Sequence, residues 1–261
     1  MSSTTDGLVG AHVEPDHPLE AAAEVGADCV QIFLSNPQGW QKPDPRDDAQ
    51  ELRDSTVPVY VHAPYLINVC SPRNNVRYGS RKILQQTCEA AADVGAAAVV
   101  VHAGHAEDGV EEGFGRWVRS LEMLKSEVTV LIENTAGGDN AVGRRFDALA
   151  GLWEAVGAVD TSFELGFCFD TCHAHAAGEE LSDAVERVLA IVGTIDLLHV
   201  NDSRDPAGTG ADRHANLGKG EIGEEPLREM IRAAGTPAIV ETPGDLDAMR
   251  ADIDFVRAAL A

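Results

Sequence analysis

The stretch VTVLIENTAG at residues 128–137 shows the pattern that decides the fold of this chain. A run of apolar and β-branched residues, which favours a buried strand, ends in the carboxylate of Glu133, and a polar turn with glycine follows. Similar runs recur along the chain, and longer amphipathic segments separate them. Several of the longer segments end in glycine, as helices often do. The alternation predicts repeated strand–helix units.

Eight such units are expected, and eight units close naturally into a (β/α)₈ TIM barrel of the α/β class. The expected strands cover residues 8–12, 29–34, 58–62, 97–102, 128–133, 164–170, 195–201 and 237–241. The expected helices cover residues 17–27, 80–96, 114–127, 144–158, 181–193, 224–235 and 245–260. A length of 261 residues with 44% hydrophobic content suits one large barrel. Residues 1–261 are therefore expected to form a single catalytic domain.

The chain carries a net charge of -23, which taken alone argues against a nucleic-acid partner. Much of the acid lies in segments such as 43–54 and 105–113, which are typical of solvated loops and helix faces. The N-terminus has no leader pattern and no window approaches about 20 apolar residues, so a cytoplasmic protein without membrane contact is expected. The five cysteines form no disulfide framework and are expected to be buried thiols.

Histidines and carboxylates stand at the ends of the expected strands or shortly after them. The candidate metal ligands are His62, His102, Glu133, Asp170, His173, His199, Asp212, His214 and Glu241. In a TIM barrel the carboxyl ends of the strands form the active-site face, so these side chains should converge there. Any one strand-end histidine is more often a packed core group than a ligand. The joint pattern, which exceeds what one ion needs, predicts a centre of two or three ions and metal-assisted phosphoryl chemistry.

Three of these candidates, His173, Asp212 and His214, are expected in loops that follow strands rather than on the strands themselves. His12 ends the first expected strand and better fits a role in ordering neighbouring groups than one in binding an ion. The loops around residues 35–50 and 202–223 are long and are therefore expected to carry function.

The chain resembles a known family, endonuclease IV, also called deoxyribonuclease IV. Its members are the trinuclear-zinc apurinic/apyrimidinic endonucleases of base-excision repair. The resemblance rests on GAHV, HAPYLIN, VHAG, IENTAG, FDTCHAHAAG, HVNDS, GADRHANLGKGEIG and VETPG, which occur in the family's order between residues 9 and 244. FDTCHAHAAG and DRHANLGKGEIG are the specific motifs, whereas GAHV or VHAG alone would be weak.

The resemblance implies a ligand set for three zinc ions, with manganese as an alternative in part. The first ion would be held by His62, His102 and Glu133, and Glu133 would bridge to the second. The second site would be completed by Asp170, His199 and Glu241. The third would be held by His173, Asp212 and His214. Every ligand position of the family pattern is filled by the expected residue type.

The resemblance also implies the reaction and the partner. Glu133 would act in catalysis by orienting or deprotonating the attacking water. The phosphodiester 5′ to an abasic site in double-stranded DNA would be hydrolysed to a 3′-hydroxyl and a 5′-deoxyribose phosphate. The protein would act as a monomer.

Side chains in the loops are expected to choose the substrate, because metal ions alone do not sense a missing base. Tyr65 and Leu66 match the positions that insert into the duplex in this family. Gln38 stands where an arginine is expected, which removes a cation from the DNA face. Residues that could contact phosphates are Arg73, Arg77, Arg81, Arg144, Arg145, Arg204, Arg213 and Lys219, each of which could equally be a solvated surface charge.

Two other functions compete with this interpretation. A sugar isomerase or epimerase of the xylose-isomerase-like class shares the architecture and places metal ligands at strand ends, but it uses one or two ions. A non-catalytic protein that binds damaged DNA or zinc would agree with Gln38 and the acidic charge. The complete ligand set argues against both.

Overall fold

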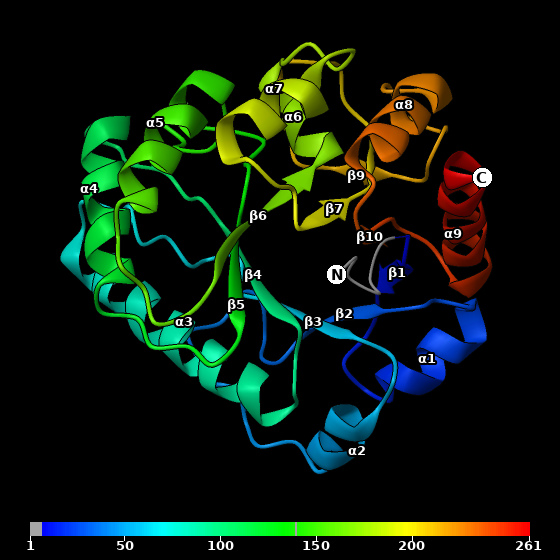
Figure 1. Ribbon diagram of the computed structural model, residues 1–261, viewed down its shortest axis with the longest axis horizontal. Helices are drawn as coiled ribbons and strands as arrows, with labels where there is room; N and C mark the ends of the chain where they lie inside the picture. The colour runs from blue at the N-terminus through cyan, green and yellow to red at the C-terminus, as the bar shows by residue number, and fades with distance from the viewer. Residues whose placement is uncertain (1–6, 139) are drawn as a thin grey trace.

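A closed barrel of parallel strands forms the centre of the protein. The computed structural model describes residues 7–138 and 140–261. The strands follow the order β1–β10–β7–β6–β5–β4–β3–β2 around the barrel, and helices surround it (Figure 1). The expected TIM barrel is confirmed.

The barrel strands are β1 (Val9–His12), β2 (Val30–Phe33), β3 (Val59–His62), β4 (Ala98–His102), β5 (Thr129–Glu133), β6 (Leu165–Asp170), β7 (Leu197–His199) and β10 (Ala238–Val240). The helices are α1 (Pro18–Val25), α2 (Ala49–Asp54), α3 (Asn74–Asp93), α4 (Val110–Leu121), α5 (Phe146–Gly157), α6 (Thr171–Ala177), α7 (Ala184–Val192), α8 (Glu224–Ala234) and α9 (Leu246–Leu260). Among the described residues, no helix is both long and apolar enough to cross a bilayer.

Alternate residues of each strand face opposite sides of the barrel wall. In β4, Val99 and Val101 belong to the large core between the barrel and its helices. Ala98 and Val100 belong to a smaller, separate core inside the barrel, together with Cys29, Tyr60, Leu131, Cys168, Leu197 and Ile239. Because side chains alternate, the residue two positions after an inward-facing residue also points into the barrel. At the end of a strand this residue lies at the barrel mouth.

This period of two brings six of the candidate ligands together. The inner residues Tyr60, Val100, Leu131, Cys168, Leu197 and Ile239 are followed two positions later by His62, His102, Glu133, Asp170, His199 and Glu241. Strand register aligns them further, because His102 pairs with Glu133 and Asp170 pairs with His199. These side chains therefore gather at the mouth of the barrel.

Two elements near the mouth differ from the expectation. The expected loop position of His173 was wrong, because β6 leads directly into α6, whose first turn contains His173. The side chain of Asp170 accepts the backbone N–H of His173 at 2.6 Å and so caps this helix. His214 was also expected in a loop, but it lies on β9 (His214–Ala215), which pairs antiparallel with β8 (Asp202–Ser203).

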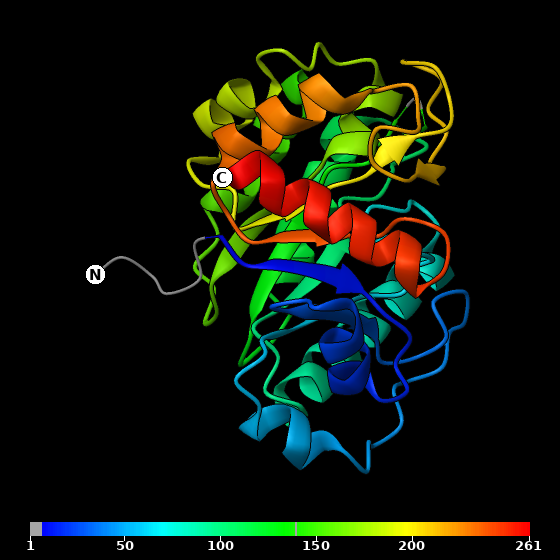
Figure 2. The same cartoon turned by 90° about the vertical axis from the view of Figure 1, so that its right-hand side faces the viewer.

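The β8–β9 hairpin lies past the carboxyl ends of the strands, at the right of Figure 2, and so does the segment that follows β2. Strand β7 ends at His199, two residues earlier than expected, because the chain turns away from the barrel to form this hairpin. The mouth of the barrel is therefore covered in part by the two loops that were expected to carry function.

Candidate metal centre

The carboxylate of Glu133 lies at the centre of the site and is fully buried. Its Oε2 is 3.2 Å from Nε2 of His62 and 3.3 Å from Nε2 of His102. Its Oε1 is 3.2 Å from Nδ1 of His199 and 3.2 Å from Nδ1 of His173. Side chains from three strand ends and from the first turn of α6 thus meet around one carboxylate.

Backbone carbonyl groups fix the protonation of several imidazoles. Nδ1 of His62 lies 2.7 Å from the carbonyl oxygen of Ala63, and Nδ1 of His173 lies 2.8 Å from that of Asn134. A carbonyl oxygen can only accept a hydrogen bond, so each Nδ1 carries the proton and donates it. In the neutral form of each ring, Nε2 is then free of hydrogen and presents a lone pair to the site, as a metal-binding histidine requires.

Gln31 fixes the tautomer of His199 in the same way, but it contacts Nε2 of this ring instead of Nδ1. Its side-chain oxygen accepts a hydrogen bond from Nε2 of His199 at 2.9 Å, so the neutral form of this ring has its lone pair on Nδ1. Its amide nitrogen donates to Oε1 of Glu241 at 2.6 Å and lies 3.0 Å from Nδ1 of His12. The buried amide of Gln31 therefore orients two candidate ligands, His199 and Glu241, and the contact with His12 helps to hold the amide in place.

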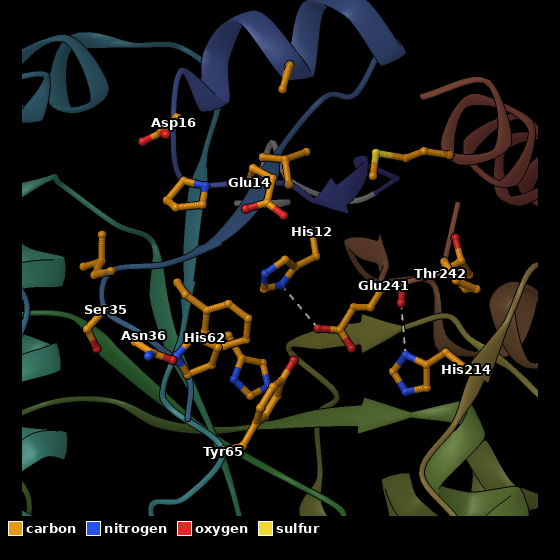
Figure 3. Close-up of a pocket in the computed structure, with 18 of the residues that line it drawn as sticks. His12, Glu14, Asp16, Ser35, Asn36, His62, Tyr65, His214, Glu241 and Thr242 are labelled. Carbon is orange, nitrogen blue, oxygen red and sulfur yellow. Dashed lines mark hydrogen bonds and ion pairs between the residues drawn. The ribbon is translucent and has the colours of Figure 1, made fainter. Parts of the chain in front are cut away.

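A second cluster of candidate ligands forms around Asp212. Its two carboxylate oxygens lie 3.2 Å from Nε2 of His173 and 3.1 Å from Nε2 of His214. Nδ1 of His214 donates to the backbone carbonyl of Glu241 at 3.0 Å (Figure 3). Nε2 of His214 is buried, and its only close neighbour among the described residues is the carboxylate of Asp212. Two imidazole nitrogens that face one carboxylate in this way form a donor set that fits a divalent cation.

Asp170 and Glu241 approach each other through Asn201. The amide nitrogen of Asn201 donates to Oδ2 of Asp170 at 2.7 Å and contacts Oε2 of Glu241 at 3.3 Å. The same Oε2 of Glu241 is 3.3 Å from Nδ1 of His199. Asp170 is fully buried, and its Oδ2 also lies 4.0 Å from Nε2 of His214. Asp170 thus stands between the His199–Glu241 pair and the Asp212 cluster.

Burial and mutual attraction shift the ionisation of these groups. Burial lowers the pKa of His102 to about 4, so its imidazole is neutral. Burial opposes protonation of His199 and His214 as well, but Glu241 beside the first and Asp212 beside the second raise the pKa of each to about 9. The two carboxylates, despite their burial, have pKa values held below the ordinary range by the imidazoles. This arrangement favours positive charge, which bound divalent cations can supply in place of protons.

A buried carboxylate outside the set of candidate ligands anchors the hairpin that carries His214. Asp202 is fully buried and accepts the backbone N–H groups of Gly220 and Ile222 at 3.0 and 2.9 Å. The chain passes so close here that a Cβ at Gly220 would lie 2.2 Å from the carbonyl oxygen of Ser203. Asp202 therefore fixes the return of the long loop onto the barrel.

The candidate ligands open into a cavity of about 1480 Å³, here called the central cavity. Its lining includes His62, His102, His173, Asp212, His214 and Glu241. Tyr65 stands at its edge with 51% of its surface exposed, and its ring stacks on His102 at a centroid distance of 5.9 Å. Figure 3 shows the side chains of Tyr65, His62, His214 and Glu241 turned toward one space. The cavity is large enough for a substrate group beside the ligands.

The residues expected to contact DNA lie in different settings. Leu66 lines a neighbouring cavity of about 390 Å³ that Tyr65 also lines. Arg213 lines the central cavity, but its guanidinium is paired with Asp205. Gln38 is exposed, and its backbone N–H donates to the side chain of Asn36 at 2.9 Å.

The cysteines are free and buried, as expected. Cys168 and Cys172 lie near the candidate ligands. Burial raises the pKa of Cys172 to about 12 and that of Cys168 well above the ordinary value, so both remain neutral thiols.

Some residues of the site were not found in the sequence. Gln31, Asn134, Asn201 and Asp202 are all buried, and each orients a ligand or its loop. A signal existed only for Gln31, which is a polar residue inside the apolar run CVQIFL and lies two positions after the inner residue Cys29.

Comparisons with known proteins agree with this geometry. Residues 19–259 match the family model of the xylose isomerase-like TIM barrel. The curated protein "Probable endonuclease 4" of Mycobacterium tuberculosis is 57% identical over 252 residues, which cover 96% of this chain and 98% of that protein. The crystal structure of endonuclease IV from Thermus thermophilus superposes with a TM-score of 0.81 at 30% identity, covering 97% of this chain and 98% of that one. A D-tagatose 3-epimerase-like protein gives a TM-score of 0.78 at 21% identity, covering 97% of both chains, and shares the fold.

Proposed function

Because this chain belongs to the endonuclease IV family of xylose isomerase-like TIM barrels, we propose that its converging side chains hold three zinc ions and cleave DNA at abasic sites. The chain is a metal-dependent, hydrolytic DNA-cleaving enzyme of DNA repair. The main support for a centre of several zinc ions is that four imidazoles meet around the carboxylate of Glu133. A carboxylate shared in this way suits two neighbouring cations better than a single cation.

The proposed ligand sets follow the groupings of side chains. The first ion would bind His62, His102 and Glu133, whose donor atoms lie within 4.8 Å of one another. The third would bind His173, Asp212 and His214, which form a similar group. The second would bind Glu133, Asp170, His199 and Glu241. The first and third sets are rich in nitrogen, which favours zinc, whereas the second is mostly oxygen and is where manganese competes best.

Zinc held there would supply Lewis acidity that acidifies a water molecule and offsets the charge of a phosphodiester. The residues supply orientation. Burial would raise the pKa of Glu133, but His102 and His199 lower it well below the ordinary value, so the carboxylate stays ionised. An ionised Glu133 accepts a hydrogen bond from the attacking water and holds it in line with the bond to be broken.

Selection of the abasic site is assigned to the rim of the central cavity. Tyr65 is exposed, and its ring contacts Phe33 edge-on at 5.1 Å and stacks on His102. Leu66 follows it directly and is half-buried. An aromatic and an aliphatic side chain in this position can wedge between base pairs and expose the damaged nucleotide. Gln38 and Arg213 would contact the DNA at the edge of this site, and a monomer suffices for the reaction.

Incision of a duplex with one abasic-site analogue tests this proposal, with the intact duplex as control. We expect cleavage only on the 5′ side of the abasic site, leaving a 3′-hydroxyl and a 5′-deoxyribose phosphate. Mapping both ends of the product checks the position. Cleavage of intact and abasic duplexes at equal rates would contradict abasic-site specificity, and turnover of a keto-sugar without DNA cleavage would indicate an epimerase instead.

Replacement of Gln31 by leucine is expected to weaken zinc binding by about 10- to 100-fold, the usual effect of losing a group that orients metal ligands. The variant removes the hydrogen bonds to His199 and Glu241 while keeping a side chain of similar size in a fully buried position. Zinc affinity is measured by competition with a chelator, and the melting temperature reports folding. Gln50→Leu, on the exposed face of α2, is the matched control. A folded Gln31→Leu protein with wild-type zinc affinity would show that Gln31 only fills space.

A further inference from the structure

A second cavity, here called the flank cavity, lies between helix α3 and the segment that follows β2. Its volume is about 490 Å³, within the range of small-molecule sites. Trp40 and Lys42 line it from the segment, and Lys82 and Gln86 line it from the helix. None of these four side chains is a candidate ligand of the metal centre.

The charge of the flank cavity is unlike that of the rest of the chain. The sequence has a net charge of -23 and four lysines, and two of these, Lys42 and Lys82, face this one cavity. Both are exposed, and neither forms a salt bridge with a carboxylate of the described residues. Two lysine ammonium groups without acidic partners attract an anion.

Trp40 gives the cavity an aromatic wall. Its side chain is 47% exposed, and its six-membered ring lies against α3 at Gly79, where a Cβ would be only 3.1 Å from the ring. Glycine at this position lets the indole lie on the helix. An exposed indole fixed in this way offers a surface on which a nucleic-acid base or sugar can stack.

Gln86 adds an unused hydrogen-bond acceptor. Its Oε1 is buried and has no hydrogen-bond partner among the described residues. A buried acceptor of this kind is costly unless a donor reaches it. The exocyclic amino group or ring N–H of a base is such a donor. The cavity thus combines positive charge, an aromatic surface and a free acceptor, the three features that recognise a nucleotide.

The flank cavity neighbours another cavity, which borders the metal centre. The cavity of about 390 Å³ that touches Tyr65, His102, His173 and Asp212 is also lined by Trp40. Val76 likewise lines both this cavity and the flank cavity. A strand that lies across the metal centre can therefore pass Trp40 and reach the two lysines.

We propose that the flank cavity binds one nucleotide of the DNA strand that lies across the metal centre, at a position beyond the cleaved phosphate. The phosphate lies between Lys42 and Lys82, and the base or deoxyribose lies against Trp40. This inference rests on the proposed function, because it takes DNA as the substrate. It explains how so acidic a chain gains attraction for DNA next to its active site.

The test compares Lys42→Gln/Lys82→Gln with Lys125→Gln/Arg232→Gln, which removes the same charge on other parts of the surface. Dissociation constants are measured for a long duplex with an uncleavable abasic analogue, and for duplexes shortened step by step on either side of it. We expect the first variant to bind the long duplex about 10-fold more weakly and to reduce the salt-dependence slope by about 0.9, the value for one phosphate contact. Shortening the duplex on one side should abolish the difference between the two variants.

Trp40 supplies an independent readout. Trp117 is fully buried and Trp153 is half-buried, so Trp40 is the most exposed of the three tryptophans. Binding of the long duplex should quench fluorescence in the wild type and not in Trp40→Phe. Equal affinities and slopes for the two double variants, or quenching that persists in Trp40→Phe, would overturn the proposal. Binding of free deoxynucleotide without any effect of the lysines on DNA would also overturn it.

These binding measurements are independent of catalysis. The dissociation constants are measured with an uncleavable analogue, so they do not depend on turnover. If the wild type fails to incise the abasic duplex, the proposed function fails whatever the binding data show. If it incises normally and the lysines have no effect, only the flank site fails.

Discussion

Glu133→Gln is expected to lower the incision rate at least about 1,000-fold, the upper end of the effect of removing one preorganised electrostatic group. The carboxylate lies within 3.3 Å of four imidazoles and belongs to two of the proposed sites. A neutral amide of the same shape cannot offset two cations or accept a proton from water. The metal content should therefore fall below that of the wild type while the barrel remains folded.

The rate is measured under single-turnover conditions, with metal content and circular dichroism on the same samples. Glu127→Gln is a matched control. Glu127 is exposed just before β5, so this substitution makes the same chemical change outside the cavity. Near-normal incision by folded Glu133→Gln would refute the bridging role. A normal metal content with a large loss of rate would leave Glu133 with a role in positioning the water alone.

The double replacement Tyr65→Ala/Leu66→Ala is expected to weaken binding of abasic duplex at least about 30-fold, since stacking of one base on one aromatic ring is worth about 1–3 kcal/mol. Hydrolysis of a small phosphodiester should change little, because that substrate has no base pairs to separate. The comparison of the two substrates separates a wedge in the DNA from support of the metal centre. Tyr65 contacts His62 and His102, so both substrates must be measured.

Tyr78→Ala/Met123→Ala is the control for this pair. Both side chains are exposed, at 56% and 65%, and neither lines the central cavity. The control should leave both substrates unaffected. If Tyr65→Ala/Leu66→Ala slows both substrates by the same factor, the two residues serve loop packing, and substrate choice must come from other parts of the rim.

Much of the barrel could be predicted because each strand is short, apolar and bounded by glycine or polar residues. The ligands at strand ends followed from the same pattern, since His62, His102 and Glu133 close β3, β4 and β5 as expected. Alternate residues of a barrel strand face inward, so Gln31, two positions after the inner residue Cys29, also faces inward. This orientation becomes visible only when the inner residues are known.

The elements outside the barrel could not be predicted in the same way. Helix α6 is seven residues long and contains two histidines, so it has no apolar period to detect. The β8–β9 pair has two residues in each strand and is held by Asp202, whose partners are 16 to 20 residues away in the chain. Contacts of this range are set by tertiary structure and leave no local pattern. The assignment of individual ligands to ions, which the family resemblance implied, stays a prediction.

The acidic charge is compatible with DNA binding if it is distributed unevenly. Three divalent ions would change the net charge from -23 to -17, since -23 + 6 = -17, and all of this positive charge would lie at the barrel mouth. Some of the arginines expected to contact phosphates are occupied, because Arg73 pairs with Glu107 and Arg213 pairs with Asp205. Lys42 and Lys82 therefore matter more than their number suggests.

Zinc titration of chelator-stripped protein, with incision of abasic duplex followed at each step, tests whether three zinc ions act together in the reaction. We expect the stripped protein to be inactive and incision to return in full only as the bound zinc approaches three ions per chain. Stripped protein that incises at the wild-type rate would contradict the claim. Full activity reached with a single bound ion would contradict it equally, because the remaining ligands would then have no part in the reaction.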